Sequence, residues 1–174
     1  MLADLHTPVL LSQDELKAAI AYDPLTGVFT RNKPYCNLAV GSRVGSLDSY
    51  GYVQVFVKGK LRLAHRLAFL YMLGRLPIAE VDHIDGNRAN NAFVNLRECD
   101  KTQNMRNRAV SGHSSTGAKG VSWHKASSKY RARLWITLEG SRKRLELGGF
   151  DTVDQAKEAY NKAAKLHHGE FYHE

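Results

Sequence analysis

Four polar residues in the middle of the chain have types and spacings suited to phosphodiester chemistry. Asp82 and His83 are adjacent, and Asn95 and Asn104 follow them. Neighbouring side chains on a strand point to opposite faces, so the carboxylate can bind a metal ion while the imidazole handles a proton. A hairpin followed by a helix would return Asn95 and Asn104 to the same point. The pattern therefore predicts a site that can cut a phosphodiester bond.

Each of these residues has a distinct expected role. Asp82 and Asn104 offer oxygen ligands, which suit a hard divalent ion such as Mg²⁺ or Mn²⁺. His83 would deprotonate the attacking water, because a neutral imidazole titrates near working pH. Asn95 would hold His83 in orientation. The alternative is a turn rich in Asn and Asp that only caps its own backbone. That alternative is a closer competitor for Asn95 than for the other three residues.

Other polar residues nearby are expected to be structural. The spacing of Asp85 and Asn87 from Asp82 does not match a calcium-binding loop, so both are predicted to form a turn. His65 stands at the start of an apolar helix and is expected to be a hydrogen-bonded core or cap histidine.

This segment resembles the HNH endonuclease family, and specifically its homing-type members, which occur largely in bacteriophages. Asp82-His83, Asn95-Leu-Arg97 and Asn104 match the family motif, and the resemblance runs from Tyr22 to Arg108. It includes Asp23-Pro-Leu-Thr-Gly27 and Ala64-His-Arg-Leu-Ala68. The resemblance implies a metal-dependent endonuclease acting on double-stranded DNA, with a ββα-metal (His-Me finger) core at about residues 78–108. One active site holds one scissile phosphate, so a monomer would nick one strand.

Composition limits the alternatives. The chain has 174 residues, 43% of them hydrophobic, which is enough for one ordinary domain or two small ones. Cys36 and Cys99 stand far apart and outside any Cys-x-x-Cys spacing, so neither a disulfide framework nor a structural zinc site is expected. No apolar run is long enough to cross a membrane, and the first residues lack the features of a signal peptide. We expect a cytoplasmic protein, in a host bacterium if the chain is phage-encoded as the resemblance implies.

The residue pattern predicts an α+β fold in two domains. A nuclease domain is expected at residues 1–109, a small polar linker at 110–118 and a second domain at 119–174. The expected elements of the first domain are a helix from a Ser12 cap to about Tyr22, a strand at 28–31, a hairpin of 51–57 with 61–63, a helix at 64–73, a strand at 81–84 and a helix capped by Asp100.

The second domain is expected to contain three antiparallel strands packed on one helix. The strands are predicted at 120–124, 129–138 and 142–148, and the helix from Thr152 to about His168, with Gly169 as its stop. Its predicted buried stripe is Val153, Ala156, Tyr160, Ala163 and His167.

Positive charge is concentrated in this second domain. Between Lys119 and Arg144 lie eight basic residues and one acid, Glu139, which together supply +7 of the chain's net +8. The strand at 129–138 alternates apolar residues with two guanidiniums and an indole. A solvated basic face would not explain the indole, so the pattern favours DNA contact. The predicted DNA-binding residues are Lys119, Lys125, Lys129, Arg131, Arg133, Trp135, Arg142 and Arg144.

The second domain also resembles the DNA-binding domain of plant ethylene-response factors, the APETALA type. The resemblance rests on Lys119-Gly-Val121, Lys129-Tyr-Arg-Ala132, Leu147-Gly-Gly-Phe-Asp-Thr152, Ala156 to Tyr160, and Ala163-Ala164 to Gly169. It implies a three-stranded sheet laid in the DNA major groove. Ser122, Trp123 and His124 stand at positions where the plant domains carry base-reading residues, so the resemblance implies the binding mode and not the target sequence.

Two other functions remain open at this stage. A sequence-specific DNA-binding regulator without nuclease activity would account for the second domain but leaves Asp82, His83 and Asn104 without a purpose. An RNA-binding or RNA-cleaving protein is also compatible with basic strands. The sequence leaves open whether the chain acts as a monomer or a dimer.

Overall fold

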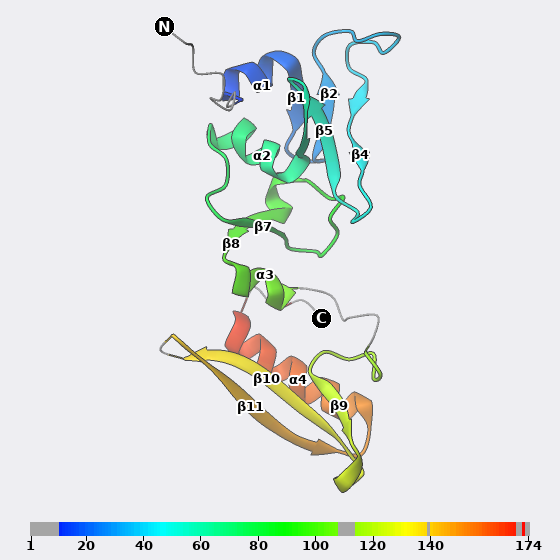
Figure 1. The fold of residues 1–174 in the computed structure, drawn as a ribbon, viewed down its shortest axis with the longest axis vertical. Helices are drawn as coiled ribbons and strands as arrows, with labels where there is room; N and C mark the ends of the chain where they lie inside the picture. The colour runs from blue at the N-terminus through cyan, green and yellow to red at the C-terminus, as the bar shows by residue number, and fades with distance from the viewer. Residues whose placement is uncertain (1–10, 108–113, 139, 170–171, 173–174) are drawn as a thin grey trace, which may run out of the picture. The chain divides into compact units, whose positions relative to one another are not determined.

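The computed structural model describes residues 11–107, 114–138, 140–169 and 172. The chain divides into a first unit, Met1–Asp100, and a second unit, Lys101–Glu174. Both contain helices and small antiparallel sheets, so the fold is α+β as predicted (Figure 1). The predicted boundary at residues 110–118 stays a prediction, since 110–113 lie outside the described residues.

The first unit begins with helix α1 (Gln13–Ala19), whose predicted cap is present. The Ser12 hydroxyl accepts from the Glu15 backbone N–H, and the Glu15 carboxylate accepts from the Ser12 N–H. The helix ends at Ala19, so the prediction that it continues to Tyr22 was wrong. Ile20–Asp23 form strand β1, in which Ile20 and Tyr22 are buried at alternate positions. This two-residue period suits a strand, not a helix.

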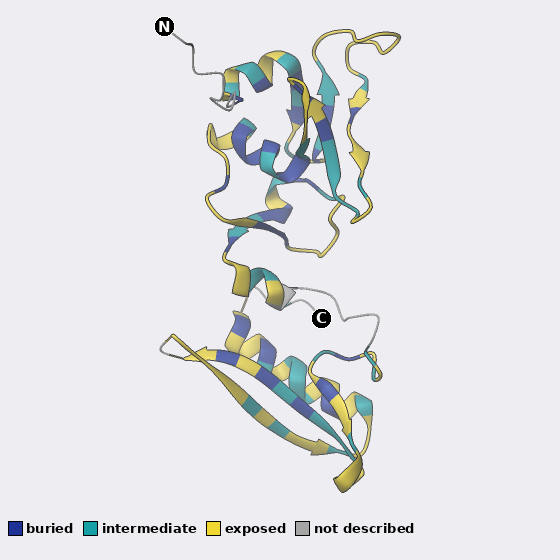
Figure 2. Cartoon of the chain, viewed as in Figure 1, coloured by how far each residue is buried: buried dark blue, intermediate teal, exposed yellow. Residues whose placement is uncertain are grey.

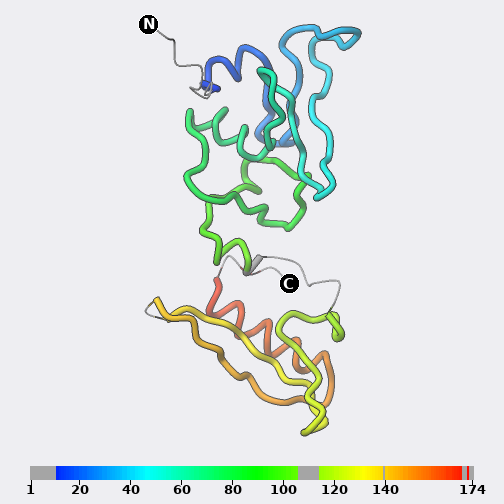
Figure 3. Tube along the Cα trace, viewed as in Figure 1, coloured from blue at the N-terminus to red at the C-terminus, as the bar shows by residue number. Residues whose placement is uncertain are grey.

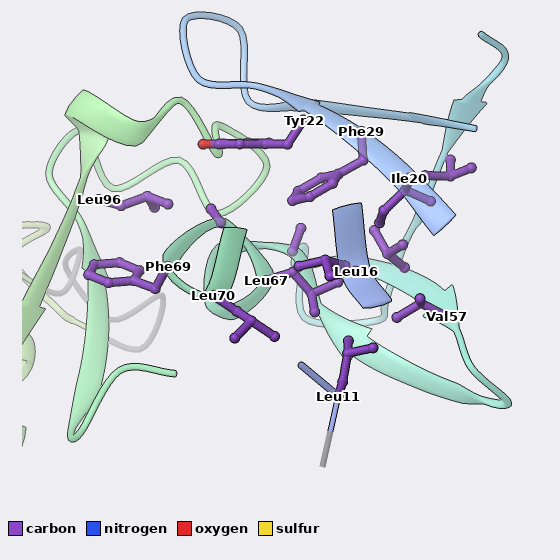
Figure 4. Packing of buried hydrophobic residues seen from close by; sticks show 14 of the residues in the cluster. Leu11, Leu16, Ile20, Tyr22, Phe29, Val57, Leu67, Phe69, Leu70 and Leu96 are labelled. Atoms are coloured by element: carbon purple, nitrogen blue, oxygen red, sulfur yellow. The ribbon is translucent and has the colours of Figure 1, made fainter. Parts of the chain in front are cut away.

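Strand β1 pairs with β2 (Val28–Arg31), and β3 (Arg43–Val44) completes the sheet. A second sheet contains β4 (Ser46–Leu47) and the predicted hairpin of β5 (Val53–Val57) and β6 (Lys60–Leu63). Helix α2 (Ala64–Leu73) follows β6 directly and ends at Gly74 in the left-handed conformation, as predicted. Its buried face lies in the core, as Figure 4 shows for the cluster around Leu16, Phe29 and Leu67.

The last two strands of the first unit carry most of the candidate chemistry. β7 (Glu80–His83) begins one residue before the predicted strand and pairs antiparallel with β8 (Leu96–Cys99). The connection between them ends in the short 3₁₀ helix η1 (Phe93–Asn95) and is drawn in green in Figure 3. The predicted helix after Asp100 is α3 (Lys101–Asn107), in the second unit.

The second unit contains the predicted three-stranded sheet. Its strands are β9 (Val121–His124), β10 (Lys129–Leu138) and β11 (Ser141–Phe150), with β10 in the centre, and the 3₁₀ helix η2 (Lys125–Ser127) links β9 to β10. Figure 2 shows buried and exposed residues alternating along β10. Helix α4 (Val153–His168) covers the face that carries Ala132, Leu134 and Ile136.

Helix α4 has the predicted boundaries. The Thr152 hydroxyl accepts from the Gln155 N–H, the Gln155 side chain accepts from the Thr152 N–H, and the helix ends before Gly169. The predicted buried stripe needs one correction, because His167 is exposed and His168 is buried. Ala156, Ala164 and His168 are buried, and Tyr160, partly buried between the two alanines, completes a four-residue spacing.

Within the described residues, no helix is long and apolar enough to span a membrane.

Candidate active site

Strand β7 buries Asp82 and His83 next to each other, each with 4% of its surface exposed. Asp82 faces Arg97 across the β7–β8 pair, and Arg97 Nε and Nη2 donate to Asp82 Oδ2 at 2.9 and 2.6 Å. A buried carboxylate is costly unless a cation and hydrogen-bond donors compensate it. Arg97 supplies both. The sequence analysis missed this role of Arg97, although the residue is part of the Asn95-Leu-Arg97 run.

The imidazole of His83 lies against a side chain that the sequence analysis did not single out. His83 Nε2 is 3.4 Å from Asn91 Oδ1, a long hydrogen bond. Asn91 is 2% exposed, its Nδ2 donates to the Ala89 carbonyl at 3.0 Å, and the Tyr22 hydroxyl donates to its carbonyl at 2.7 Å. The only signal in the sequence was the Asn90-Asn91 doublet in a loop already rich in Asn and Asp.

Asn95 fixes the backbone directly after His83. Its Oδ1 accepts from the Asp85 N–H at 3.0 Å, and its Nδ2 donates to Asp85 Oδ1 and the Asn90 carbonyl, both at 2.9 Å. Its own carbonyl accepts from the Ile84 N–H at 2.9 Å. Asn95, at the end of the long β7–β8 connection, therefore ties that end to the start of the connection at Ile84 and Asp85. The predicted action of Asn95 on His83 itself stays a prediction.

Asp85 and Asn87 form the predicted turn, in which the Asn87 N–H donates to Asp85 Oδ1 at 2.8 Å. Burial works to raise the pKa of Asp85, but hydrogen bonds from Asn90 and Asn95 outweigh it and hold that pKa below its usual value. Asp85 is therefore an ionised anchor for the loop.

Two rings, those of His65 and Tyr52, lie beside His83. The His65 ring lies edge-on to the His83 ring at 5.2 Å, and the Tyr52 ring is 5.4 Å from His65 and 6.0 Å from His83. His65 is buried, as expected, but it is not the hydrogen-bonded histidine that was predicted. Its Nδ1 has no hydrogen-bond partner in the described part of the chain.

Both histidines are held in the neutral form. Burial lowers the pKa of His83, and the nearby Arg88 charge adds to this, while Asn91 and the charges of Asp85 and Asp82 oppose it. Burial, helped by the charges of His83 and Arg66, lowers the pKa of His65 to about 3. A neutral His83 at pH 7 can accept a proton.

The predicted site residues thus fall in both units. The structure brings Asp82, His83 and Asn95 together in the first unit. Asn104 is partly buried on α3, in the second unit. In the described residues, no group of three or more His, Cys, Asp or Glu side chains is arranged to hold a metal ion.

The predicted DNA-binding face of the second unit is the side of the sheet opposite α4. Trp135 lies across from Arg144 and is half exposed, and the Arg142 guanidinium lies 4.6 Å from the centre of its ring. Glu146 stands on the same face and pairs with Arg133 at 3.2 Å and with Arg144 at 2.8 Å. Glu146 lies just outside the basic segment of residues 119–144 and neutralises part of the charge of that segment.

The remaining predicted DNA contacts lie at the β9 end of the sheet. Arg131 is on the same face as Trp135, opposite Ser122 of β9. Lys129 pairs with Asp151 at 2.5 Å, and Lys125 begins η2. Lys119 lies 5.2 Å from the centre of the Tyr172 ring, and burial lowers its pKa.

Comparison with known proteins identifies the segment that contains the candidate site. A family model described as HNH endonuclease matches residues 62–106, from β6 to α3. An uncharacterised HNH endonuclease, L560 of Acanthamoeba polyphaga mimivirus, is 31% identical over 126 residues, which are 72% of this chain and 63% of that protein. Protein 3.8 of Escherichia phage T7 is 33% identical over 91 residues, which are 52% of this chain and 71% of that protein.

Among solved structures, the chain is similar to one that describes DNA binding and cleavage by the HNH homing endonuclease I-HmuI. The TM-score is 0.39 and the sequence identity 21%, over 85% of this chain and 76% of that one. The present chain spans less than two thirds of the mimivirus relative. The matched segment contains Asp82, His83, Asn95 and Asn104. Residues 62–106, which carry the candidate site, therefore match the HNH endonuclease family, and over a longer stretch the chain is similar to a viral HNH endonuclease.

Proposed function

We propose that this chain is a divalent-metal-dependent endonuclease of the homing type that hydrolyses phosphodiester bonds in double-stranded DNA. The observation that carries the proposal is a buried imidazole held neutral, His83, next to a buried carboxylate, Asp82, on one strand of the segment matched to the HNH family. A neutral base beside an anionic ligand is the pairing that metal-assisted hydrolysis requires.

The donor set fits a hard divalent cation. The Asp82 carboxylate supplies an anionic oxygen next to His83, and Arg97 compensates the cost of burying it. We propose that Asp82 and Asn104 hold Mg²⁺ or Mn²⁺, which both prefer oxygen ligands. When bound, the ion would neutralise the scissile phosphate and stabilise the leaving 3′ oxygen.

The hydrogen bonds around His83 support Nδ1 as the nitrogen that would act as the base. Asn91 Nδ2 donates to the Ala89 carbonyl, which leaves Asn91 Oδ1 facing His83 Nε2. An amide oxygen only accepts, so the neutral ring carries its proton on Nε2 and its lone pair on Nδ1. His83 Nδ1 would take a proton from water as the water oxygen bonds to phosphorus and the bond to the 3′ oxygen breaks. The products would be a 5′ phosphate and a 3′ hydroxyl.

One such site acts on one strand at a time. A single chain should therefore nick duplex DNA. A double-strand break would need a second chain, or a second round of binding and cleavage by the same chain.

The second unit would supply most of the DNA affinity. We propose that it is a DNA-binding domain of the ethylene-response-factor type, which contacts the major groove through the sheet face with Arg131, Trp135 and Arg142. Support comes from the antiparallel β11-β10-β9 order, the packing of α4 on the opposite face, and the indole with its guanidinium neighbour on the basic face.

A plasmid-nicking assay tests the nuclease activity. Wild-type protein should convert supercoiled to open-circular DNA with Mg²⁺ or Mn²⁺ and not with EDTA. His83→Ala should lower the rate by about 10²–10⁴, the contribution of a general base, without changing DNA affinity. His167→Ala is the matched control, because His167 is exposed on α4. Wild-type nicking by His83→Ala would contradict the assignment, and duplex binding without nicking would favour a DNA-binding regulator.

A further inference from the structure

The β7–β8 connection carries an exposed guanidinium, Arg88, that forms no ion pair with the described residues. Arg88 Nη1 donates to the Tyr50 carbonyl at 2.8 Å, and the guanidinium carbon lies 4.8 Å from the centre of the Tyr52 ring. The Asp48 carboxylate, in the connection between β4 and β5, is close enough for the Arg88 charge to help lower its pKa, but it accepts its hydrogen bonds from the N–H groups of Tyr50 and Tyr52.

Three described cations of the first unit form ion pairs, whereas Arg31 lies over the Tyr35 ring and Arg66 donates to two backbone carbonyls. Lys58 pairs with Glu15, Arg75 with Glu98 and Arg97 with Asp82. Arg88 is held by an aromatic face and a neutral carbonyl, which fix its orientation and leave its full positive charge. A guanidinium fixed in this way keeps free donors in a planar fork that matches a phosphate group.

The Tyr52 ring connects this cation to the candidate active site. Tyr52 contacts Arg88 and also lies 6.0 Å from the His83 ring and 5.4 Å from the His65 ring. The positive charge of Arg88 is close enough to His83 to lower the pKa of that histidine. Beside Arg88, the Tyr50 side chain is 74% exposed. The guanidinium therefore lies on an exposed part of the surface, with only the Tyr52 ring between it and the His83 ring.

We propose that Arg88, oriented by Tyr50 and Tyr52, binds a backbone phosphate of DNA next to the scissile bond and so positions the strand for His83. The inference rests on the proposed nuclease function and deepens it. It assigns the first unit a phosphate contact of its own, separate from the sheet face of the second unit.

Salt dependence of DNA binding tests the phosphate contact without any need for cleavage. Full-length Arg88→Gln and wild type would be titrated against a short fluorescent duplex in EDTA over a range of KCl concentrations. Loss of one phosphate contact should flatten the log–log slope by about 0.9. Arg43→Gln is the matched control, because Arg43 is an exposed arginine of the same unit on β3 and its loss changes the net charge equally. A wild-type slope in Arg88→Gln, or an equal change in Arg43→Gln, would overturn the proposal.

Plasmid nicking tests the positioning. Arg88→Gln should nick about 10- to 100-fold more slowly, the loss expected for a charge-assisted hydrogen bond, and Arg43→Gln should nick at the wild-type rate. Arg88→Lys keeps the charge without the fork, so it should keep the slope and nick more slowly than wild type. Wild-type nicking by Arg88→Gln would overturn the positioning role. If wild type does not nick but Arg88→Gln flattens the slope, the phosphate contact is supported and the nuclease function fails.

Discussion

His65 and His83 share burial and an edge-on contact but differ in their hydrogen bonds. His83 Nε2 faces the Asn91 amide, which makes Nδ1 the proposed proton acceptor. His65 Nδ1 is buried and has no partner in the described residues. Protonation is therefore part of the proposed reaction at His83, whereas at His65 it would only leave a charge in an apolar setting.

The pH dependence of nicking should reflect His83. Because burial lowers the pKa of His83 in the folded protein, the base form should persist below pH 6.5, the usual value for histidine. The acidic limb of the rate profile should then have its midpoint below that pH. Single-turnover nicking rates between pH 5 and 8 would measure it. A midpoint above pH 6.5 would contradict a His83 base in this environment.

His65 should make stability fall as the solution is acidified. Its pKa is about 3 in the folded protein and near 6.5 when unfolded, so between these values the unfolded chain binds more protons. The contribution is fully present above pH 6.5 and is lost as pH falls towards 3, by at most about 1.4 kcal/mol per pH unit. His65→Phe keeps a planar ring and should reduce this slope in urea unfolding at pH 7 and pH 5. An unchanged slope would contradict the prediction.

At the scale of elements, the β1–β2 hairpin supports the site from outside the matched segment. The Tyr22 hydroxyl of β1 donates to the Asn91 carbonyl, and the Pro24 carbonyl of the turn accepts from the Phe93 N–H at 2.8 Å. Gly27 closes this turn with φ +72°. A Cβ on Gly27 would lie 2.2 Å from the backbone carbon of Asn91. The turn therefore sets where Asn91, and through it His83, can lie.

Gly27→Ala should damage both stability and activity. The substitution combines a left-handed backbone with a backbone collision, so we expect more than about 2 kcal/mol of destabilisation and reduced nicking at a temperature where the variant remains folded. Gly59→Ala is the matched control, because Gly59 has φ +75° with nothing within 4 Å of an added Cβ. That control should cost about 1 kcal/mol and leave nicking unchanged. Thermal melting and plasmid nicking would be compared, and equal effects of the two substitutions would contradict the inferred support.

An element could be predicted from the sequence when its own residues define it, and not when its form depends on residues far away in the chain. Helix α2 was predicted to the residue because an apolar run and Gly74 define it. The end of α1 was missed because Ile20 and Tyr22 suit either a helix or a strand until β2 supplies a partner. The site motif was visible in Asp82 and His83, but the contacts of Arg97, Asn91 and Tyr52 were not. They depend on strand register and on loops that meet only in three dimensions.

At the scale of the whole molecule, the positive charge that the sequence concentrates in residues 119–144 is not equally available. Glu146 pairs with Arg133 and Arg144, whereas Arg131 and Arg142 form no ion pair in the described part of the chain. Arg142 is instead held against Trp135. Arg131 and Arg142 are therefore the best placed cations on the sheet face to contact phosphate.

Substitutions on the sheet face should distinguish the arginines in ion pairs, Arg133 and Arg144, from Arg131 and Arg142. Arg131→Gln and Arg142→Gln should each flatten the log–log salt dependence of duplex binding by about 0.9. Glu146→Gln should tighten binding and steepen the dependence, because it releases Arg133 and Arg144. Trp135→Ala should weaken binding with a smaller change in slope, through lost stacking and a freer Arg142. Fluorescence anisotropy over a range of salt would measure all four, and unaltered binding by Glu146→Gln would contradict the model.

The sheet also limits how the length of this chain can vary. The β10–β11 register shifts between Ala132 and Arg133, so Leu147 is an extra residue on β11, beside Gly148 with φ +122°. Because of this extra residue, both Leu147 and Phe150 pack on the α4 side, although they stand three positions apart. Removing Leu147 would leave Phe150 paired with Tyr130 but would take one apolar side chain out of the core beneath α4. Homologues should therefore gain or lose residues in the connection between β10 and β11 and keep a constant length from Glu146 to Phe150.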